Sequence, residues 1–250
     1  MSDRELRVRP LSGLGEIADG DDLGSLIAAA ADPAGDEIVV LSQKVVSKAE
    51  GRLRSLAGVE AGERAVQLAE LTGKEPAMVE LILAESRSVV RAGPGVLIVE
   101  TRDGWICANA GIDTSNLPEA GWVALLPEDA DASARAIRAG IRRASGASPA
   151  VVIADSFGRP WRLGQSDVAI GCAGLEPLDD WRGRRDASGA ELAATRISIA
   201  DEVAAAADLV RDKDSGVPGA VVSGLGHLVT ADDGPGARAQ QRPADEDLFR

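Results

Sequence analysis

The sequence is poor in the side chains on which many functional sites depend. Its 250 residues include one histidine, two cysteines and no tyrosine, and aromatic residues make up 2% of the chain. A single histidine excludes any metal site built from several imidazoles, and the spacing of Cys107 and Cys172 fits neither a zinc site nor a disulfide framework. Six aromatic rings are too few for a platform that stacks single-stranded nucleic acid. We therefore expect any bound metal to have oxygen ligands.

Basic residues are also scarce relative to acidic ones. The chain has 27 lysines and arginines against 40 aspartates and glutamates, which gives a net charge of −13. A sequence-independent nucleic-acid binder or a protein of anionic membranes needs the opposite balance. No apolar run approaches the roughly 18 residues of a membrane span, and the first ten residues lack the apolar segment of a secretory signal. We expect a cytoplasmic protein that binds neither nucleic acid nor membranes.

The pattern of apolar residues predicts an α+β fold with mixed or antiparallel sheets. Short aliphatic runs bounded by glycine, proline or aspartate predict strands at residues 37–42, 95–100, 105–108, 122–126, 150–155, 167–171 and 219–223. Helical spacing predicts helices at residues 61–71, 76–83, 131–144 and 188–210, the last with Ser188 and Glu191 as a capping box. We expect one domain over residues 1–230, with two lobes whose boundary the sequence does not resolve. An acidic and loosely ordered tail is expected over residues 231–250.

A basic segment follows the first predicted strand. The string SQKVVSKAEGR, residues 42–52, places Lys44, Lys48 and Arg52 four residues apart. Such a cluster at the end of a strand can hold phosphate oxygens through charge-assisted hydrogen bonds. The alternative is a solvated basic patch with no ligand. The chain contains no GxxxxGK[ST] string, so the phosphate loop of that type is excluded.

Two further segments place an aspartate after a run of apolar residues. In NAGIDTSN, residues 109–116, Asp113 is either a ligand for Mg²⁺ or Mn²⁺ or part of a turn closed by side-chain hydrogen bonds. In VVIADSFGRPWRLGQSDVAIG, residues 151–171, Asp155 and Ser156 follow four apolar residues. The two aspartates and the hydroxyl would make an oxygen site for one or two divalent ions, which can clamp a phosphate during its transfer. The alternative for residues 151–171 is a structural network of arginine and aspartate.

These three segments and the stretch ADEVAAAADLV…GVPGAVV, residues 200–222, resemble the single-domain form of the γ-glutamyl ligases of coenzyme F420. The similarity extends from residue 13 to about residue 226. The resemblance implies a GTP-dependent amide ligase that adds L-glutamate to the carboxylate of the F420 precursor and can extend a γ-linked polyglutamate tail. It also implies an intertwined homodimer, one or two Mg²⁺ or Mn²⁺ ions and a monovalent cation such as K⁺.

The resemblance also assigns roles to individual residues. It implies catalytic roles for Asp113, Asp155 and Lys48, and metal ligation by Asp113, Asp155 and Ser156. It implies that the nucleotide is bound by Leu14, Gly15, Glu16, Ile17, Gln43, Lys48, Asn116, Gly216, Val217 and Pro218. As basic residues of the third segment, Arg159 and Arg162 are candidates for binding the substrate.

The mechanism that fits these residues activates a carboxylate, which by itself is a poor acylating agent. GTP would transfer its γ-phosphoryl group to the acceptor carboxylate and leave as GDP, and the amine of glutamate would then attack the acyl phosphate and release phosphate. Positioning and electrostatics supply most of the rate in phosphoryl transfer, so no protein nucleophile is needed. Two alternatives use the same residues. One is a metal-dependent phosphohydrolase with water as the nucleophile, and the other is a non-catalytic protein that binds the nucleotide or the coenzyme.

Overall fold

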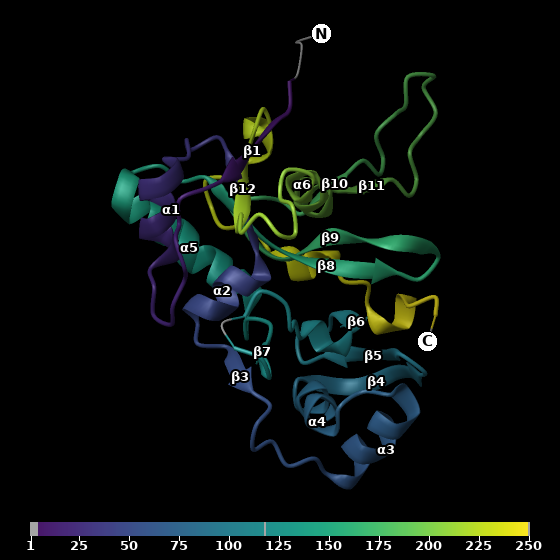
Figure 1. Ribbon diagram of the computed structural model, residues 1–250. Coiled ribbons are helices and arrows are strands. Elements are labelled where there is room, and N and C mark those ends of the chain that lie inside the picture. The colour runs from purple at the N-terminus through teal and green to yellow at the C-terminus, as the bar shows by residue number, and fades with distance from the viewer. Residues whose placement is uncertain (1–4, 118, 250) are drawn as a thin grey trace.

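Five strands form the largest sheet of the protein (Figure 1). The computed structural model describes residues 5–117 and 119–249. The strands lie in the order β1 (Arg7–Leu11), β12 (Gly219–Ser223), β2 (Ile38–Ser42), β8 (Ala150–Arg159) and β9 (Arg162–Ala173). β2 and β8 are parallel, whereas the other neighbouring pairs are antiparallel. Ser42 pairs with Ala154, so the C-terminal end of β2 lies beside Asp155 of β8. We call this side of the sheet the edge where β2 ends.

Helices cover both faces of this sheet. On one face lie α1 (Leu23–Ala31), α2 (Gln43–Ala49) and α5 (Ala130–Ser145), and on the other lies α6 (Ile199–Asp208). Along β2, Val39 and Leu41 pack against the first group of helices, and Ile38 and Val40 pack on the side of α6. Successive side chains of a strand point to opposite faces, so a strand between two helical layers is apolar at every position. This explains the unbroken aliphatic run at the start of β2.

The packing of α1 against α5 brings two backbones into contact. A Cβ atom on Gly24 would lie 2.5 Å from the Cα atom of Gly140, so a side chain there would force the helices apart. The ends of α5 follow local rules. The side chain of Asp129 accepts a hydrogen bond from the backbone N–H of Ala132, and the helix stops at Gly146, which has a φ of 82°. These features fix the position and the ends of α5, which packs in the same core as β8, the strand that carries Asp155.

A second group of elements has its own hydrophobic core and lies below the large sheet in Figure 1. It contains α3 (Glu63–Thr72), α4 (Pro76–Ala84), β4 (Ser86–Gly93), β5 (Val96–Thr101) and β6 (Ile106–Ala108). The three strands form an antiparallel sheet, and Leu68, Ile82 and Val99 are among the buried residues between it and the helices. A short antiparallel pair, β3 (Leu53–Ser55) with β7 (Trp122–Ala124), lies next to this group.

The predicted α+β class is confirmed, and most predicted elements are present. The predicted strands correspond to β2, β5, β6, β7, β8, β9 and β12, and three of the predicted helices correspond to α3, α4 and α5. β1, β4 and α1 were not predicted, and neither was α2, which begins directly after β2 without a loop. The two lobes and the intertwined homodimer stay predictions.

The prediction of one long helix over residues 188–210 is wrong in its first half. Residues 188–195 form turns, β11 (Arg196–Ser198) pairs with β10 (Leu178–Asp180), and α6 begins only at Ile199. The hydroxyl and the backbone N–H of Ser188 both donate to the carboxylate of Asp186, over 2.7 and 2.9 Å. Ser188 is therefore part of a turn closed by an aspartate side chain, and not the first residue of a capping box.

The strands β8 and β9 extend further than their predicted ends. The polar segment between Asp155 and Asp167 continues both strands and forms a hairpin. At its tip, Trp161 is 79% exposed and Leu163 is 97% exposed. Trp161 also contacts Phe249, with 5.9 Å between the ring centroids. The hairpin thus carries its polar residues outward from the edge where β2 ends.

The C-terminal segment makes specific contacts with the body of the protein. Ala237 is fully buried, and its backbone N–H donates to the carboxylate of Asp131 over 2.6 Å. Arg238 pairs with Asp103 and Asp129. These contacts hold part of the segment that the sequence predicts as a loosely ordered tail. No helix in the described ranges is long and apolar enough to cross a membrane.

Candidate functional site

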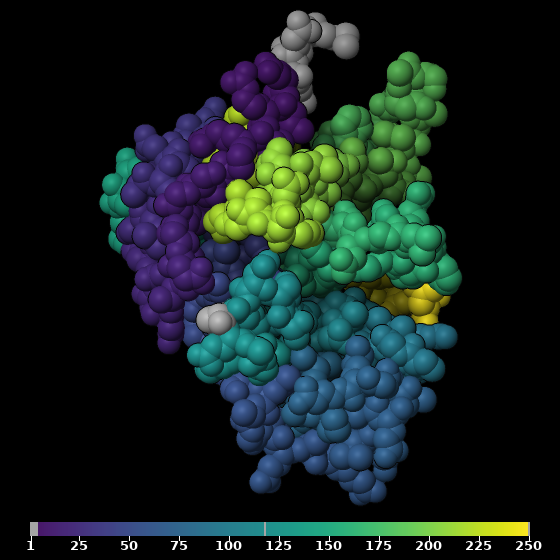
Figure 2. All heavy atoms as spheres, viewed as in Figure 1, coloured from purple at the N-terminus to yellow at the C-terminus, as the bar shows by residue number. Residues whose placement is uncertain are grey.

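A cleft of about 760 Å³ opens at the edge of the large sheet where β2 ends. The residues that line it fall within five segments, which are residues 15–17, 42–48, 107–116, 154–167 and 208–218. In Figure 2 the light-green segment before β12 and the teal segment after β6 lie on either side of a hollow. The side-chain amide of Asn116 donates to the backbone carbonyl of Lys213 over 3.3 Å, which joins these two segments. The cleft therefore collects groups that are far apart in the sequence.

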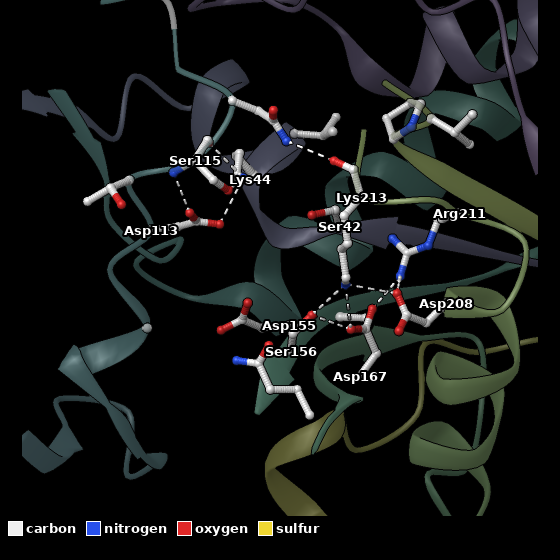
Figure 3. Close-up of a pocket in the computed structure, with 18 of the residues that line it drawn as sticks. Ser42, Lys44, Asp113, Ser115, Asp155, Ser156, Asp167, Asp208, Arg211 and Lys213 are labelled. Atoms are coloured by element: carbon white, nitrogen blue, oxygen red, sulfur yellow. Dashed lines mark hydrogen bonds and ion pairs between the residues drawn. The ribbon is translucent and has the colours of Figure 1, made fainter. Parts of the chain in front are cut away.

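One side of the cleft, which we call the Asp113 wall, consists of Asp113, Ser115, Asn116 and Lys44 of α2. The Nζ atom of Lys44 lies 2.8 Å from Oδ2 of Asp113 and donates to Oγ of Ser115 over 2.7 Å (Figure 3). The backbone N–H of Ser115 donates to Oδ1 of Asp113 over 2.7 Å. Burial alone would raise the pKa of Asp113, but these hydrogen bonds hold the pKa below its ordinary value. Asp113 is therefore ionised and paired with a cation.

The chain reaches the Asp113 wall through three residues with left-handed backbone. Asn109, Ala110 and Gly111 have φ angles of 55°, 55° and 70°. A Cβ atom on Gly111 would lie 2.7 Å from the side chain of Leu126, so glycine is required there. Asn109 also carries a buried Oδ1 atom without a hydrogen-bond donor among the described residues. Strained backbone and an unpaired buried acceptor both cost free energy, and such features are concentrated at functional sites.

The opposite side, which we call the Asp155 wall, consists of Asp155, Ser156, Asp167, Asp208, Arg211 and Lys213. Burial raises the pKa of Asp155 to about 7, and the negative charges of Asp167 and Asp113 add to the rise. The two predicted metal-binding carboxylates line the same cleft, and the charge of Asp113 acts on Asp155. Asp155 thus differs from Asp113, because the nearby carboxylates outweigh the effect of Lys44 on it.

An ion network surrounds Ser156 on the Asp155 wall. Its Oγ atom donates to Oδ1 of Asp167 over 2.6 Å, and Nζ of Lys213 donates to the same Oγ over 3.0 Å (Figure 3). Asp167 is buried and pairs with the buried guanidinium of Arg211. Lys213 also lies 3.0 Å from Oδ1 of Asp208. The network fixes the hydroxyl of Ser156 and leaves the carboxylate of Asp155 outside its hydrogen bonds.

The predicted nucleotide-binding residues of α2 and of the early loop meet in the structure. Nζ of Lys48 lies 2.5 Å from Oε1 of Glu16, and both residues line the cleft. Lys44 and Lys48 are four residues apart on α2, which places them on one face of the helix. Other predicted residues of the same group also line the cleft, namely Gly15, Ile17, Asn116, Gly216, Val217 and Pro218.

Four predicted site residues do not line the cleft. Leu14 is buried in the main hydrophobic core, and Gln43 is buried where its side-chain oxygen accepts a hydrogen bond from Ser47. Arg159 and Arg162 lie at the exposed end of the β8–β9 hairpin, where Arg159 donates to the backbone carbonyl of Leu163. The structure therefore separates the two candidate substrate-binding arginines from the residues that line the cleft.

Several lining residues were not predicted as part of the site. Lys44 belongs to the predicted basic cluster, and its position four residues before Lys48 was the signal that marked it. Asp208 and Arg211 are three residues apart at the end of α6, which is a weaker signal because such pairs are common on solvated helices. Asp167 lies within a predicted segment, but its contact with Ser156 follows from the hairpin register of Ser156 opposite Asp167.

The composition of the cleft fits a hard cation with oxygen ligands. The described residues contain no group of three or more histidine, cysteine, aspartate or glutamate side chains arranged as a metal site. Two carboxylates and a hydroxyl still fit Mg²⁺ or Mn²⁺, since such ions are held by one or two carboxylates together with water and substrate phosphates. Burial and the negative charges of nearby carboxylates raise the pKa of Asp155, and a bound cation would neutralise part of that negative charge. Burial raises the pKa of both cysteine thiols to about 12, so thiolate ligation does not fit.

Comparison with known proteins identifies the family. The model of the family described as F420-0:Gamma-glutamyl ligase matches residues 13–224. A protein of Methanopyrus kandleri named Coenzyme F420:L-glutamate ligase is 44% identical over 98% of this chain and 98% of its own length. Proteins of the same name from Methanothermobacter thermautotrophicus and Haloarcula marismortui are 42% and 45% identical, covering 96% and 87% of this chain and 97% and 86% of their own lengths. The chain therefore belongs to the F420-0:gamma-glutamyl ligase family.

Proposed function

We propose that this protein adds L-glutamate to the carboxylate of the coenzyme F420 precursor, with GTP as the co-substrate and Mg²⁺ or Mn²⁺ as the metal. Family membership supports the reaction, because the relatives are named as coenzyme F420:L-glutamate ligases. The observation that carries the proposal is the placement of Asp113 and Asp155 on the walls of one cleft that is also lined by three lysines. Carboxylates that bind cations and lysines that bind phosphates are the groups that phosphoryl transfer requires.

The cleft offers GTP two kinds of contact. Lys44 and Lys48 provide positive charge from α2, and their ammonium groups suit the phosphate oxygens. The loops at residues 15–17 and 216–218 line the cleft next to them and provide backbone groups. Asn116 supplies an amide from the opposite segment. We assign these residues to nucleotide binding, and for all of them except Lys44 the family resemblance implies the same role.

The chemistry proceeds through an acyl phosphate. The acceptor carboxylate attacks the γ-phosphorus of GTP, the bond from this phosphorus to the bridging oxygen of GDP breaks, and the amine of glutamate then displaces phosphate. Asp113, Asp155 and Ser156 would hold the divalent cation, which when bound neutralises the charge of the phosphates. The protein's part is to hold the acceptor, the nucleotide and the amine in line and to exclude competing water.

The lining of the cleft does not provide an activated cysteine or a histidine among the described residues. Cys107 lines the cleft, but burial raises the pKa of its thiol to about 12, so the thiol stays neutral and weakly nucleophilic. Among the residues that the structure describes, the cleft lining contains no histidine. This composition supports direct transfer of the phosphoryl group to the substrate, with no covalent intermediate on the protein.

The finer parts of the proposal concern the product and the assembly. We include extension to a γ-linked polyglutamate tail, a requirement for a monovalent cation such as K⁺, a homodimer and a cytoplasmic location. Mass spectrometry of the coenzyme after incubation measures the number of glutamates that are added. Sedimentation of the purified protein measures the number of chains in the assembly.

The experiment that tests the proposal measures GDP and the glutamylated coenzyme together. The protein is incubated with GTP, Mn²⁺, L-glutamate and the F420 precursor, and each component is omitted in turn. We expect GDP and product only when all four are present. Phosphate release without glutamate would identify a phosphohydrolase. Nucleotide or coenzyme binding without turnover would identify a non-catalytic member of the family, and either result would overturn the proposal.

A further inference from the structure

A cation already lies beside Ser156 in the structure. The Nζ atom of Lys213 is 3.0 Å from Oγ of Ser156, 3.0 Å from Oδ1 of Asp208 and 3.9 Å from Oδ1 of Asp167 (Figure 3). The first two oxygens are within hydrogen-bonding distance of the ammonium group, and the carboxylate of Asp167 is near enough for an ion pair. The side chain of Lys213 therefore fills this corner of the cleft with one positive charge.

The hydroxyl oxygen of Ser156 cannot bind the ammonium group and a divalent cation at the same time. Ser156 donates its proton to Asp167 over 2.6 Å, so the remaining lone pairs of Oγ face the cleft and accept from Lys213. A metal ion bound by the same oxygen would compete for these lone pairs and would repel the ammonium at short range. We propose that Lys213 is a built-in competitor of the metal, whose ammonium group holds Ser156 in the metal-free cleft and leaves Ser156 when a divalent cation binds. This inference rests on the proposed function only in taking Ser156 as a metal ligand.

Lys213 is placed so that its side chain can move while its backbone stays. The side chain is 71% exposed, and the backbone carbonyl is held separately by the amide of Asn116 over 3.3 Å. The carboxylate of Asp208, 3.0 Å from Nζ, offers the displaced ammonium a partner at the rim. The neighbouring Arg211 is different, because its guanidinium is buried against Asp167. Displacement of Lys213 therefore leaves the buried carboxylate of Asp167 paired with Arg211.

Lys48 provides a matched control within the same cleft. Both lysines carry one positive charge and line the cleft, but Lys48 pairs with Glu16 at 2.5 Å and not with the oxygens of Ser156, Asp167 or Asp208. Replacing either lysine by glutamine removes the same charge from the site. The two substitutions therefore separate direct competition at Ser156 from a general change in the electrostatic field.

The test measures Mn²⁺ binding to the chelator-treated protein without nucleotide, from the electron paramagnetic resonance signal of unbound Mn²⁺. We expect Lys213→Gln to bind Mn²⁺ about tenfold more tightly than the unchanged protein, within the usual range of coupling between ligands. Lys213→Arg keeps the charge and should stay within about twofold of the unchanged protein, as should Lys48→Gln. Thermal melting followed by circular dichroism checks that each variant is folded.

Three results would overturn the inference. These are an unchanged or weaker Mn²⁺ affinity in Lys213→Gln, an equal gain in Lys48→Gln, and a lack of Mn²⁺ binding in every variant. Because the measurement needs no turnover, it stands apart from the ligase assay. Tighter binding in Lys213→Gln with no ligase activity would support the competition and overturn the proposed reaction alone.

Discussion

Each wall of the cleft carries one of the two predicted metal-binding aspartates, and the pKa values of these two aspartates are shifted in opposite directions. On the Asp113 wall, Lys44 and Ser115 provide hydrogen bonds that lower the pKa of Asp113. On the Asp155 wall, burial and neighbouring carboxylates raise the pKa of Asp155 to about 7. The comparison teaches that one carboxylate is stabilised by the protein itself, whereas the other is stabilised by protonation or by an added cation. A site of this kind trades stability of the empty protein for affinity toward a metal.

The largest expected effect is on catalysis, where both walls should matter. We expect Asp155→Asn and Asp113→Asn each to lower kcat/KM of the ligase by about 1000-fold or more, because each removes a charge that would hold the cation on the phosphates. Asp32→Asn makes the same chemical change at the exposed end of α1, where Asn tolerates the left-handed φ of 42°, and should leave the activity unchanged. Activity within tenfold of the unchanged protein in Asp155→Asn would contradict the role of this wall.

The second prediction concerns the stability of the Asp155 wall. Arg211→Met should lower the free energy of unfolding by about 3 kcal/mol, because it leaves the buried carboxylate of Asp167 without its guanidinium partner. Urea unfolding of the metal-free protein measures this loss. Adding Asp167→Asn to Arg211→Met should restore most of the stability, since the buried charge is then absent. A loss that the second substitution does not reduce would point to packing and not to charge.

The third prediction is that substitution of the two aspartates changes the free energy of unfolding of the metal-free protein in opposite directions. At pH 8, Asp155→Asn should raise the free energy of unfolding by about 2 kcal/mol, and Asp113→Asn should lower it by about 1 kcal/mol. The raised pKa of Asp155 means that the native state takes up a proton as the pH falls through about 7. The gain from Asp155→Asn should therefore shrink between pH 8 and pH 5.

The cost of Asp113→Asn should follow a different course with pH. The pKa of Asp113 is lowered in the folded protein, so its stabilisation is complete above the ordinary carboxylate pKa and is lost only in more acidic solution. Unfolding measured in a chelator at pH 5 and at pH 8 should give the same loss for this variant. Equal pH dependence in the two variants would contradict the comparison between the walls.

The smallest expected effect is that of Ser115→Ala on the Asp113 wall. Ser115→Ala removes the hydroxyl that accepts from Lys44 over 2.7 Å, but the backbone N–H that donates to Asp113 remains. We expect a stability loss of at most about 1 kcal/mol and a decrease in kcat/KM of about fivefold or less. Thermal unfolding and steady-state kinetics measure the two quantities. A decrease in kcat/KM as large as that of Asp113→Asn would mean that the hydroxyl, and not the backbone, positions the carboxylate.

The sequence predicts the parts of this site that lie next to buried strands. The aliphatic run before Asp155 identifies β8, because a strand between two helical layers must be apolar at every position. The position of Asp155 after that run could therefore be predicted from the residues alone. Ser188 shows the limit of local patterns. It matches a capping box, yet the carboxylate of Asp186 captures its N–H and hydroxyl and forms a turn.

The meeting of the two walls could not be predicted from local patterns. Asn116 of the Asp113 wall and Lys213 of the Asp155 wall are 97 positions apart, and their contact depends on how the segment after α6 is placed. The left-handed backbone at Asn109 and Ala110 is also set by tertiary contacts, since neither residue type requires it. The resemblance to a family implied that these segments form one site. The residue patterns alone indicated only the separate segments.

The two buried thiols make the protein a reporter of its own opening motions. Cys172 lies in the core between the large sheet and α6, and Cys107 of β6 lines the cleft. An alkylating reagent can reach Cys172 only when the sheet separates from its helix, but a smaller movement of the cleft is enough to uncover Cys107. The ratio of the two labelling rates therefore distinguishes breathing of the cleft from unfolding of the whole chain, with no probe added to the molecule.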